Sequence, residues 1–196
     1  MEIAMQTQQE PTKIGTSTFQ HPAIQKLQRV AHLMRLASAG YALWMLWNIL
    51  NWWMDADKVT RHFGSFIGRD LSAMGASQRL GALALDLIAW ALLLVSVVQG
   101  WKFLGYLGQP ARWSGAAARH ISMCAWFAIA CEGFAQLARP LQSFLLTAHL
   151  PVAEQVWKWR FQNVDLLAVL FCLALLMFAY VFAWTMEMAE ENRSFV

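Results

Sequence analysis

The longest uncharged hydrophobic block of the chain covers residues 166–186. These 21 residues carry no formal charge, and Thr185 and the hydroxyl of Tyr180 are their main polar groups. About 20 apolar residues, with a rise of about 1.5 Å each, cover the roughly 30 Å hydrocarbon core of a bilayer. The block therefore predicts a transmembrane helix.

The same reasoning predicts four spans, at about residues 36–54, 80–98, 116–138 and 164–186. A basic amphipathic helix that carries Lys26, Arg29 and Arg35 begins at Pro22 and leads into the first span. We expect residues 1–21 to form a disordered tail, residues 22–189 to form a four-helix membrane domain, and residues 190–196 to form a C-terminal tail. The predicted fold class is an all-α integral membrane protein.

Two longer loops lie on the side of the membrane opposite to the termini in this scheme. In residues 55–78, apolar residues recur three or four apart, which predicts a short amphipathic helix that lies on the membrane or caps the bundle. Arg139 and Pro140 are expected to end the third span.

The second loop carries an alternating pattern just before the last span. Trp157, Trp159 and Phe161 alternate with Lys158 and Arg160, which is typical of a strand with one aromatic face and one basic face. We therefore expect a short strand segment on the membrane surface before the last helix.

The composition agrees with a membrane protein and excludes several other classes. The chain is 58% hydrophobic and 14% charged, whereas soluble domains carry about 25% charged residues. A net charge of +3 is too small to indicate direct binding of nucleic acid. The three cysteines fall in predicted spans without a CxxC spacing, so no zinc or covalent haem motif is present.

The orientation does not follow from charge alone. Lys and Arg are equally numerous on the two sides of the predicted spans, so the positive-inside rule does not decide between them. The tight basic turn at residues 99–119 favours cytoplasmic termini. We expect a multi-pass protein of the cell inner membrane with both termini in the cytoplasm.

Polar residues inside predicted spans are costly and indicate candidate sites. Asp86 lies seven residues after Arg79, and Glu132 lies seven residues before Arg139, so both acids lie about 10 Å inside the same surface. Four more polar residues belong to the same half of the membrane: Gln136, Asn48, Asn51 and Asp165. One interpretation is a polar cleft in which Asp86 and Glu132 bind a proton or cation. The other is that each acid only fixes helix packing.

Two histidines provide a cofactor hypothesis. His32 and His120 both lie near the surface on the side of the termini, and histidines from two helices could ligate a haem. The alternative is that both side chains simply meet water at the interface, in which case no cofactor and no metal is expected. No HExxH, GxSxG or P-loop motif supports catalysis, so we predict no catalytic residues.

Three segments carry a resemblance to a known family. These are PLQSFLLT at residues 140–147, NVDLL at 163–167 and AEENRSFV at 189–196. With the basic lead-in, the four spans and the long first loop, they resemble the bacterial membrane proteins of the domain of unknown function 2975 family. The resemblance implies four helices with cytoplasmic termini in a bacterial inner membrane. It also implies that some relatives are encoded beside small helix-turn-helix regulators, and it implies no activity.

Two functions are consistent with these observations. The first is a non-enzymatic sensory, regulatory or scaffolding subunit, with a protein partner or a second copy in the membrane and a cytoplasmic regulator as a further partner. Its docking tail would be Glu190, Glu191, Asn192, Arg193, Ser194, Phe195 and Val196. The second is a membrane redox or transport component that uses His32 and His120, or Asp86 and Glu132.

Overall fold

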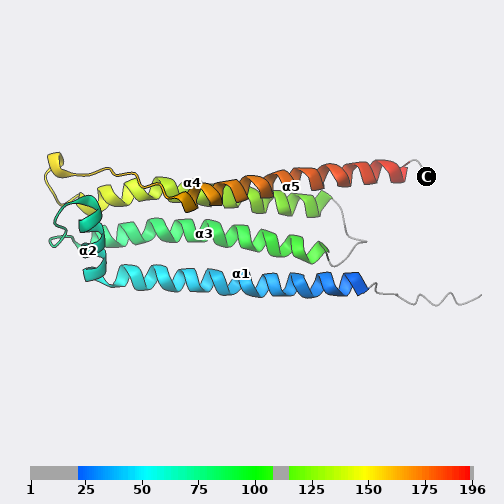
Figure 1. Ribbon diagram of the computed structural model, residues 1–196, viewed down its shortest axis with the longest axis horizontal. Helices are drawn as coiled ribbons and strands as arrows, with labels where there is room; N and C mark the ends of the chain where they lie inside the picture. The colour runs from blue at the N-terminus through cyan, green and yellow to red at the C-terminus, as the bar shows by residue number, and fades with distance from the viewer. Residues whose placement is uncertain (1–21, 108–114, 195–196) are drawn as a thin grey trace, which may run out of the picture.

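The computed structural model describes residues 22–107 and 115–194, and this part of the chain is all-helical. Four long helices lie side by side along the long axis, and a short helix crosses one end (Figure 1). The α-helices are α1 (Pro22–Met54), α2 (Ala56–Ile67), α3 (Ala76–Leu107), α4 (Gly115–Thr147) and α5 (Asn163–Ser194). A 3-10 turn, η2, covers Val152–Glu154.

Three of the helices are long and apolar enough to cross a membrane. They are α3 over Ala76–Tyr106, α4 over Gly115–Thr147 and α5 over Asn163–Ala189. Their large apolar side chains remain exposed in the monomer, as Phe171 (68%) and Met177 (68%) illustrate on α5. A water-soluble helix would hide such a surface, whereas a bilayer solvates it. The structure therefore supports a membrane protein.

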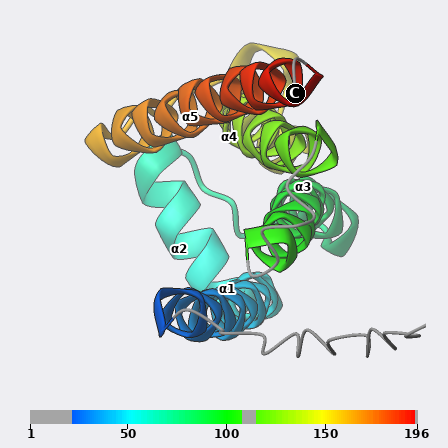
Figure 2. The same cartoon turned by 90° about the vertical axis from the view of Figure 1, so that its right-hand side faces the viewer.

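The packing of the long helices follows their order in the chain. The main packing partners are α1 with α3, α3 with α4, and α4 with α5. Viewed along the helices, α1 and α5 lie at the two ends of this row (Figure 2). Both the start of α1 and the end of α5 lie at the end of the molecule that is opposite to α2 (Figure 1).

The amphipathic helix predicted in residues 55–78 is present as α2. Asp55 caps its N-terminus, because the Asp55 side chain accepts a 3.1 Å hydrogen bond from the backbone N–H of Lys58. Gly68 ends the helix at φ 78°, a left-handed conformation that favours glycine. One apolar cluster joins α2 to α1, α3 and α4: Trp53, Val59, Ile67, Leu71, Ala82 and Leu146. This cluster packs α2 against the end of α1, the start of α3 and the end of α4.

The expected end of the third membrane helix at Arg139–Pro140 is wrong. Helix α4 continues through Pro140 to Thr147. An internal proline costs about 3 kcal/mol or more, because it removes a backbone hydrogen bond. The continuation buries Leu146 and Thr147 completely, and such burial offsets that cost.

The expected strand is also absent from the described residues. Residues 155–162 are extended, but no second strand pairs with them. Instead their backbone bonds to side chains of α4 that are one helical turn apart. The three contacts are Val156 N to Thr147 Oγ1 (3.1 Å), Lys158 N to Ser143 Oγ (3.0 Å), and Arg139 Nη1 to Arg160 O (2.8 Å). Four helical residues rise about 6 Å and two extended residues about 6.6 Å, so the two spacings match.

Candidate functional site

The best-connected polar cluster surrounds Arg139 of α4, where α5 begins. The guanidinium of Arg139 makes two hydrogen bonds to the Asp165 carboxylate, and Nη2–Oδ1 is 2.7 Å. Arg139 Nη1 also donates to the carbonyl of Arg160 and, at 3.2 Å, to Oε1 of Gln136. Asp165 is 9% exposed and accepts a further bond from Gln162 N at 2.8 Å. A carboxylate in the first turn of a helix is favoured by the helix dipole, so Asp165 stabilises the start of α5 in two ways.

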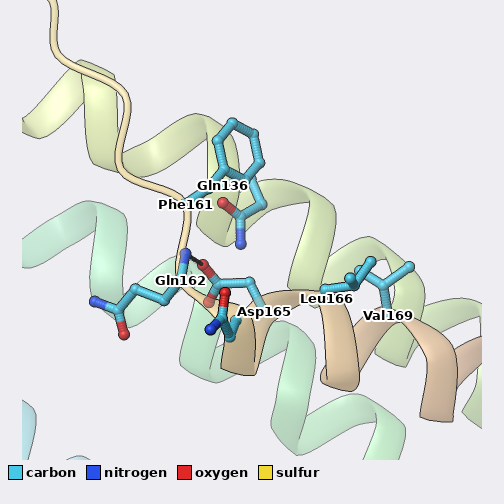
Figure 3. Close-up of a pocket in the computed structure, with 7 residues that line it drawn as sticks. Gln136, Phe161, Gln162, Asp165, Leu166 and Val169 are labelled. Carbon is cyan, nitrogen blue, oxygen red and sulfur yellow. Dashed lines mark hydrogen bonds between the residues drawn. The ribbon is translucent and has the colours of Figure 1, made fainter.

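A pocket of about 370 Å³ lies beside this ion pair. Its polar lining comes from Gln136 of α4, from Gln162 at the end of the extended segment, and from the first turn of α5 (Figure 3). The seven lining residues are Gln136, Phe161, Gln162, Asn163, Asp165, Leu166 and Val169. Nε2 of Gln136 is buried without a hydrogen bond of ordinary geometry. The side chain of Gln136 still interacts with the Asp165 carboxylate, so the pocket places an incompletely bonded amide beside a carboxylate that already has partners.

A second polar node lies on α3 at Asp86. Its Oδ2 accepts a 2.6 Å hydrogen bond from Nε1 of Trp53, and its Oδ1 accepts a 2.6 Å bond from Nε2 of Gln142. Gln142 is buried and also donates to the carbonyl of Ala82 at 3.2 Å. Asp86 thus joins α1, α3 and α4, with partners from neighbouring helices rather than Arg79 of its own helix.

Arg139 interacts electrostatically with acids of both polar clusters. Its guanidinium interacts with the carboxyls of Asp165, Glu132 and Asp86. Among the described residues, no hydrogen bond joins Asp86 to Glu132, and Glu132 takes part in no ion pair within 4.0 Å. The structure therefore gives Asp86 and Asp165 separate hydrogen-bond partners.

The remaining candidates on α1 and α3 take no part in the hydrogen bonds described for Arg139 and Asp86. Asn48 is exposed and donates back to the carbonyl of Trp44 at 2.7 Å within α1. Asn51 is exposed on the same helix. Arg79 contributes its backbone N–H to Gly75 near the start of α3, and its side chain has no ion pair in the described structure.

The two histidines of the haem hypothesis occupy different environments. Nδ1 of His120 lies 2.8 Å from Oε1 of Gln99, and its ring stacks on Tyr106 with centroids 5.7 Å apart. His32 is exposed on α1, which packs mainly on α3 rather than on α4. Over residues 22–107 and 115–194, no group of three or more His, Cys, Asp and Glu residues could hold a metal ion.

The predicted docking tail is only partly described. Helix α5 continues to Ser194, and Glu191 and Asn192 are exposed near its end. The side chains of Glu190, Arg193 and Ser194, and the whole of Phe195 and Val196, lie outside the described residues.

Sequence reasoning missed Gln142 and Trp53 as partners of Asp86. Because α4 continues past Pro140, Gln142 is helical and lies three residues after Arg139. The two side chains therefore occupy neighbouring positions on one face of the helix. For Trp53 the available signal was its indole N–H, a donor that needs a partner when it is buried.

Comparison of the chain with protein-family models, with curated proteins and with solved structures finds no match.

Proposed function

We propose that this protein is a non-enzymatic, four-span protein of a bacterial inner membrane that senses a signal or scaffolds a partner. In this proposal α1 is the fourth span. Its 33 residues extend about 50 Å, which exceeds the thickness of the hydrocarbon core. Its four Trp and two Asn residues lower its mean hydropathy, while its exposed Leu36 and Leu43 suit contact with lipid. An even number of spans agrees with the start of α1 and the end of α5 lying at the same end of the molecule (Figure 1).

One observation carries the sensory part of the proposal, namely the continuity of α5. This helix of 32 residues begins at the polar pocket and ends at the C-terminal tail, about 48 Å away. Its main packing partner is α4 alone. A ligand that competes for Asp165 or Gln136 would therefore loosen the start of a helix whose other end carries the tail.

In this proposal the C-terminal tail passes the signal from the pocket to a partner. Glu187 and Glu191 are exposed in the last turns of α5. Acids at a helix C-terminus oppose the helix dipole, so helix stability does not explain their presence. We propose that the tail docks a cytoplasmic regulator or a partner in the membrane.

The resemblance to the domain of unknown function 2975 family fits this proposal. The resemblance implies four helices with cytoplasmic termini, and it implies relatives that are encoded beside small regulators. Both features are expected of a membrane subunit that signals to the cytoplasm. Membership in that family and the cytoplasmic location of the termini are parts of the proposal.

The test is a crosslinking pull-down of the full-length protein from its native membrane. Deletion of residues 192–196 should abolish recovery of the partner and leave membrane insertion intact, because no apolar span is removed. Asp165→Asn should change recovery although the tail is present. Asp57→Asn removes one exposed acid from α2 and is the matched control, which should recover the partner as the unchanged protein does.

Equal recovery with and without residues 192–196, in protein that is still in the membrane, would contradict the docking tail. Equal recovery from Asp165→Asn and Asp57→Asn would contradict the link between the pocket and the tail.

A further inference from the structure

A second cavity, of about 520 Å³, opens between α2 and the extended segment, away from the Asp165 pocket. Lys58, Arg61 and His62 of α2 line it on one side, and Arg160 of the extended segment lines it on the other. Phe66 and Trp52 supply its apolar surface. Arg160 also takes part in the Arg139 cluster, through its backbone carbonyl, whereas its side chain lines this cavity.

Two cations share a single aromatic ring at this cavity. Nζ of Lys158 lies 4.6 Å from the centroid of Phe66, and Cζ of Arg160 lies 5.2 Å from the same centroid. Lys158 also donates a 2.6 Å hydrogen bond to the carbonyl of Phe66. The contacts hold both side chains at α2, so the cavity gains positive charge from two distant parts of the sequence.

The cations here outnumber their acidic partners. Lys58 pairs with Asp55 at 2.9 Å, and Arg61 donates through Nε only to the backbone carbonyl of Asp57. The ion pairs of the described residues do not include Arg61, Lys158 or Arg160. Like charges that are held together repel one another, and a bound anion would offset this repulsion.

The surroundings indicate which anion fits. Trp157, Trp159 and Phe161 are 54%, 47% and 72% exposed and alternate with the two cations along the extended segment. Exposed Trp residues gather where the acyl chains of a bilayer meet the headgroups. Cations in the same segment therefore lie at the level of the phospholipid phosphates, and Arg and Lys are the usual ligands of phosphate.

We infer that this cavity is a binding site for the headgroup of an anionic phospholipid. Arg160 and Arg61 donate to its phosphate, Lys58 and Lys158 add positive charge, and the aromatic residues of the extended segment lie against its acyl chains. The alternating pattern of residues 156–161 is thereby explained as a lipid-facing aromatic row beside a headgroup-facing basic row, in place of a strand.

The experiment is native mass spectrometry of the full-length protein in a neutral detergent, with equal amounts of phosphatidylglycerol and phosphatidylcholine added. The unchanged protein should retain phosphatidylglycerol preferentially. Arg160→Glu and, as an independent variant, Arg61→Glu should each lower the retained phosphatidylglycerol about tenfold, as expected when one charge-assisted contact becomes repulsive. Arg69→Glu is the matched control, because Arg69 is exposed just after α2 but does not line the cavity, and it should change retention less than about twofold.

Equal retention of the two lipids by the unchanged protein would overturn the inference. So would an equal loss in Arg69→Glu and in the two cavity variants, because that result indicates only general surface charge. A separate arm adds inorganic phosphate at millimolar concentration. Displacement of phosphatidylglycerol by phosphate at these concentrations would overturn the assignment to a lipid in favour of a free anion.

Discussion

Arg139 and Asp165 are 26 residues apart in the chain, yet two parallel hydrogen bonds join their side chains where α5 begins. The same guanidinium donates to the carbonyl of Arg160, so one side chain holds the extended segment and the start of α5 against α4. Side-chain exposures of 30% and 11% indicate that water competes only partly for this contact. The pair therefore acts as the fastening point of α5.

The first prediction concerns this fastening point. Arg139→Gln and Asp165→Asn should each lower the free energy of unfolding in detergent, because each leaves a mostly buried charge without its partner. A double-mutant cycle should give a coupling energy of about 1–3 kcal/mol, as expected for residues in direct contact. Additive losses would show that the two side chains act independently.

The second prediction separates the two acids of α3 and α4. Asp86→Asn replaces one acceptor oxygen with a donor amide, so either Trp53 or Gln142 loses its hydrogen bond, at a cost of about 1–3 kcal/mol. Asp86→Asn and Gln142→Ala should therefore be strongly coupled in unfolding measurements. Asp86→Asn and Glu132→Gln should be additive within about 0.5 kcal/mol. A coupling of Asp86 with Glu132 as large as that with Gln142 would instead support the shared proton or cation site.

The third prediction tests the ladder between α4 and the extended segment. Ser143→Ala removes the acceptor of the Lys158 N–H and should destabilise the segment by about 0.5–1.5 kcal/mol. Hydrogen exchange at the Lys158 amide should become faster, while exchange in the middle of α5 stays unchanged. Ser122→Ala, a serine on α4 outside the ladder, is the control. Unchanged exchange at Lys158 would mean that the segment is held by other contacts.

The sequence predicted these elements unequally, for physical reasons. Apolar blocks and three-four spacing predicted the long helices and α2, because burial of one face determines both. The predicted end of α4 was wrong because the free-energy cost of Pro140 inside the helix is outweighed by the burial of Leu146 and Thr147. The strand was wrong because side chains of α4, which are remote in sequence, bond to the backbone of the extended segment.

The candidate site was foreseen in part for similar reasons. The grouping of Arg139, Gln136 and Asp165 near one surface followed from helix spacing and predicted depth. The bonds from Trp53 and Gln142 to Asp86 could not be predicted, because they depend on which helices are neighbours. That order, α1 beside α3 and α3 beside α4, is a property of the packed structure.

The fourth prediction concerns topology. If both termini are cytoplasmic, a membrane-impermeant maleimide added outside intact cells should label Ser65→Cys on α2 and should not label Glu187→Cys on α5, in a background with the native cysteines replaced. Both positions are exposed in the structure, so both should be labelled after the cells are opened. Labelling of Glu187→Cys alone in intact cells would reverse the orientation.

The fifth prediction uses the cap of α2, which lies outside the membrane-spanning helices. The Lys58 ammonium, at 2.9 Å, and the Lys58 backbone N–H hold the pKa of the Asp55 carboxyl below its usual range. A carboxyl with a lowered pKa in the folded protein stabilises the fold above its unfolded pKa, and this stabilisation is lost as the pH falls through the folded pKa.

At neutral pH, hydrogen exchange in the first turn of α2 should therefore be faster in Asp55→Ala than in the unchanged protein. Asp55→Asn keeps an acceptor oxygen for the Lys58 N–H and should restore most of the protection, without the ion pair. As the pH is lowered through the pKa of Asp55, the protection of the unchanged protein should fall to that of Asp55→Asn. A constant difference between these two proteins down to the lowest pH would show that the charge of Asp55 does not stabilise α2.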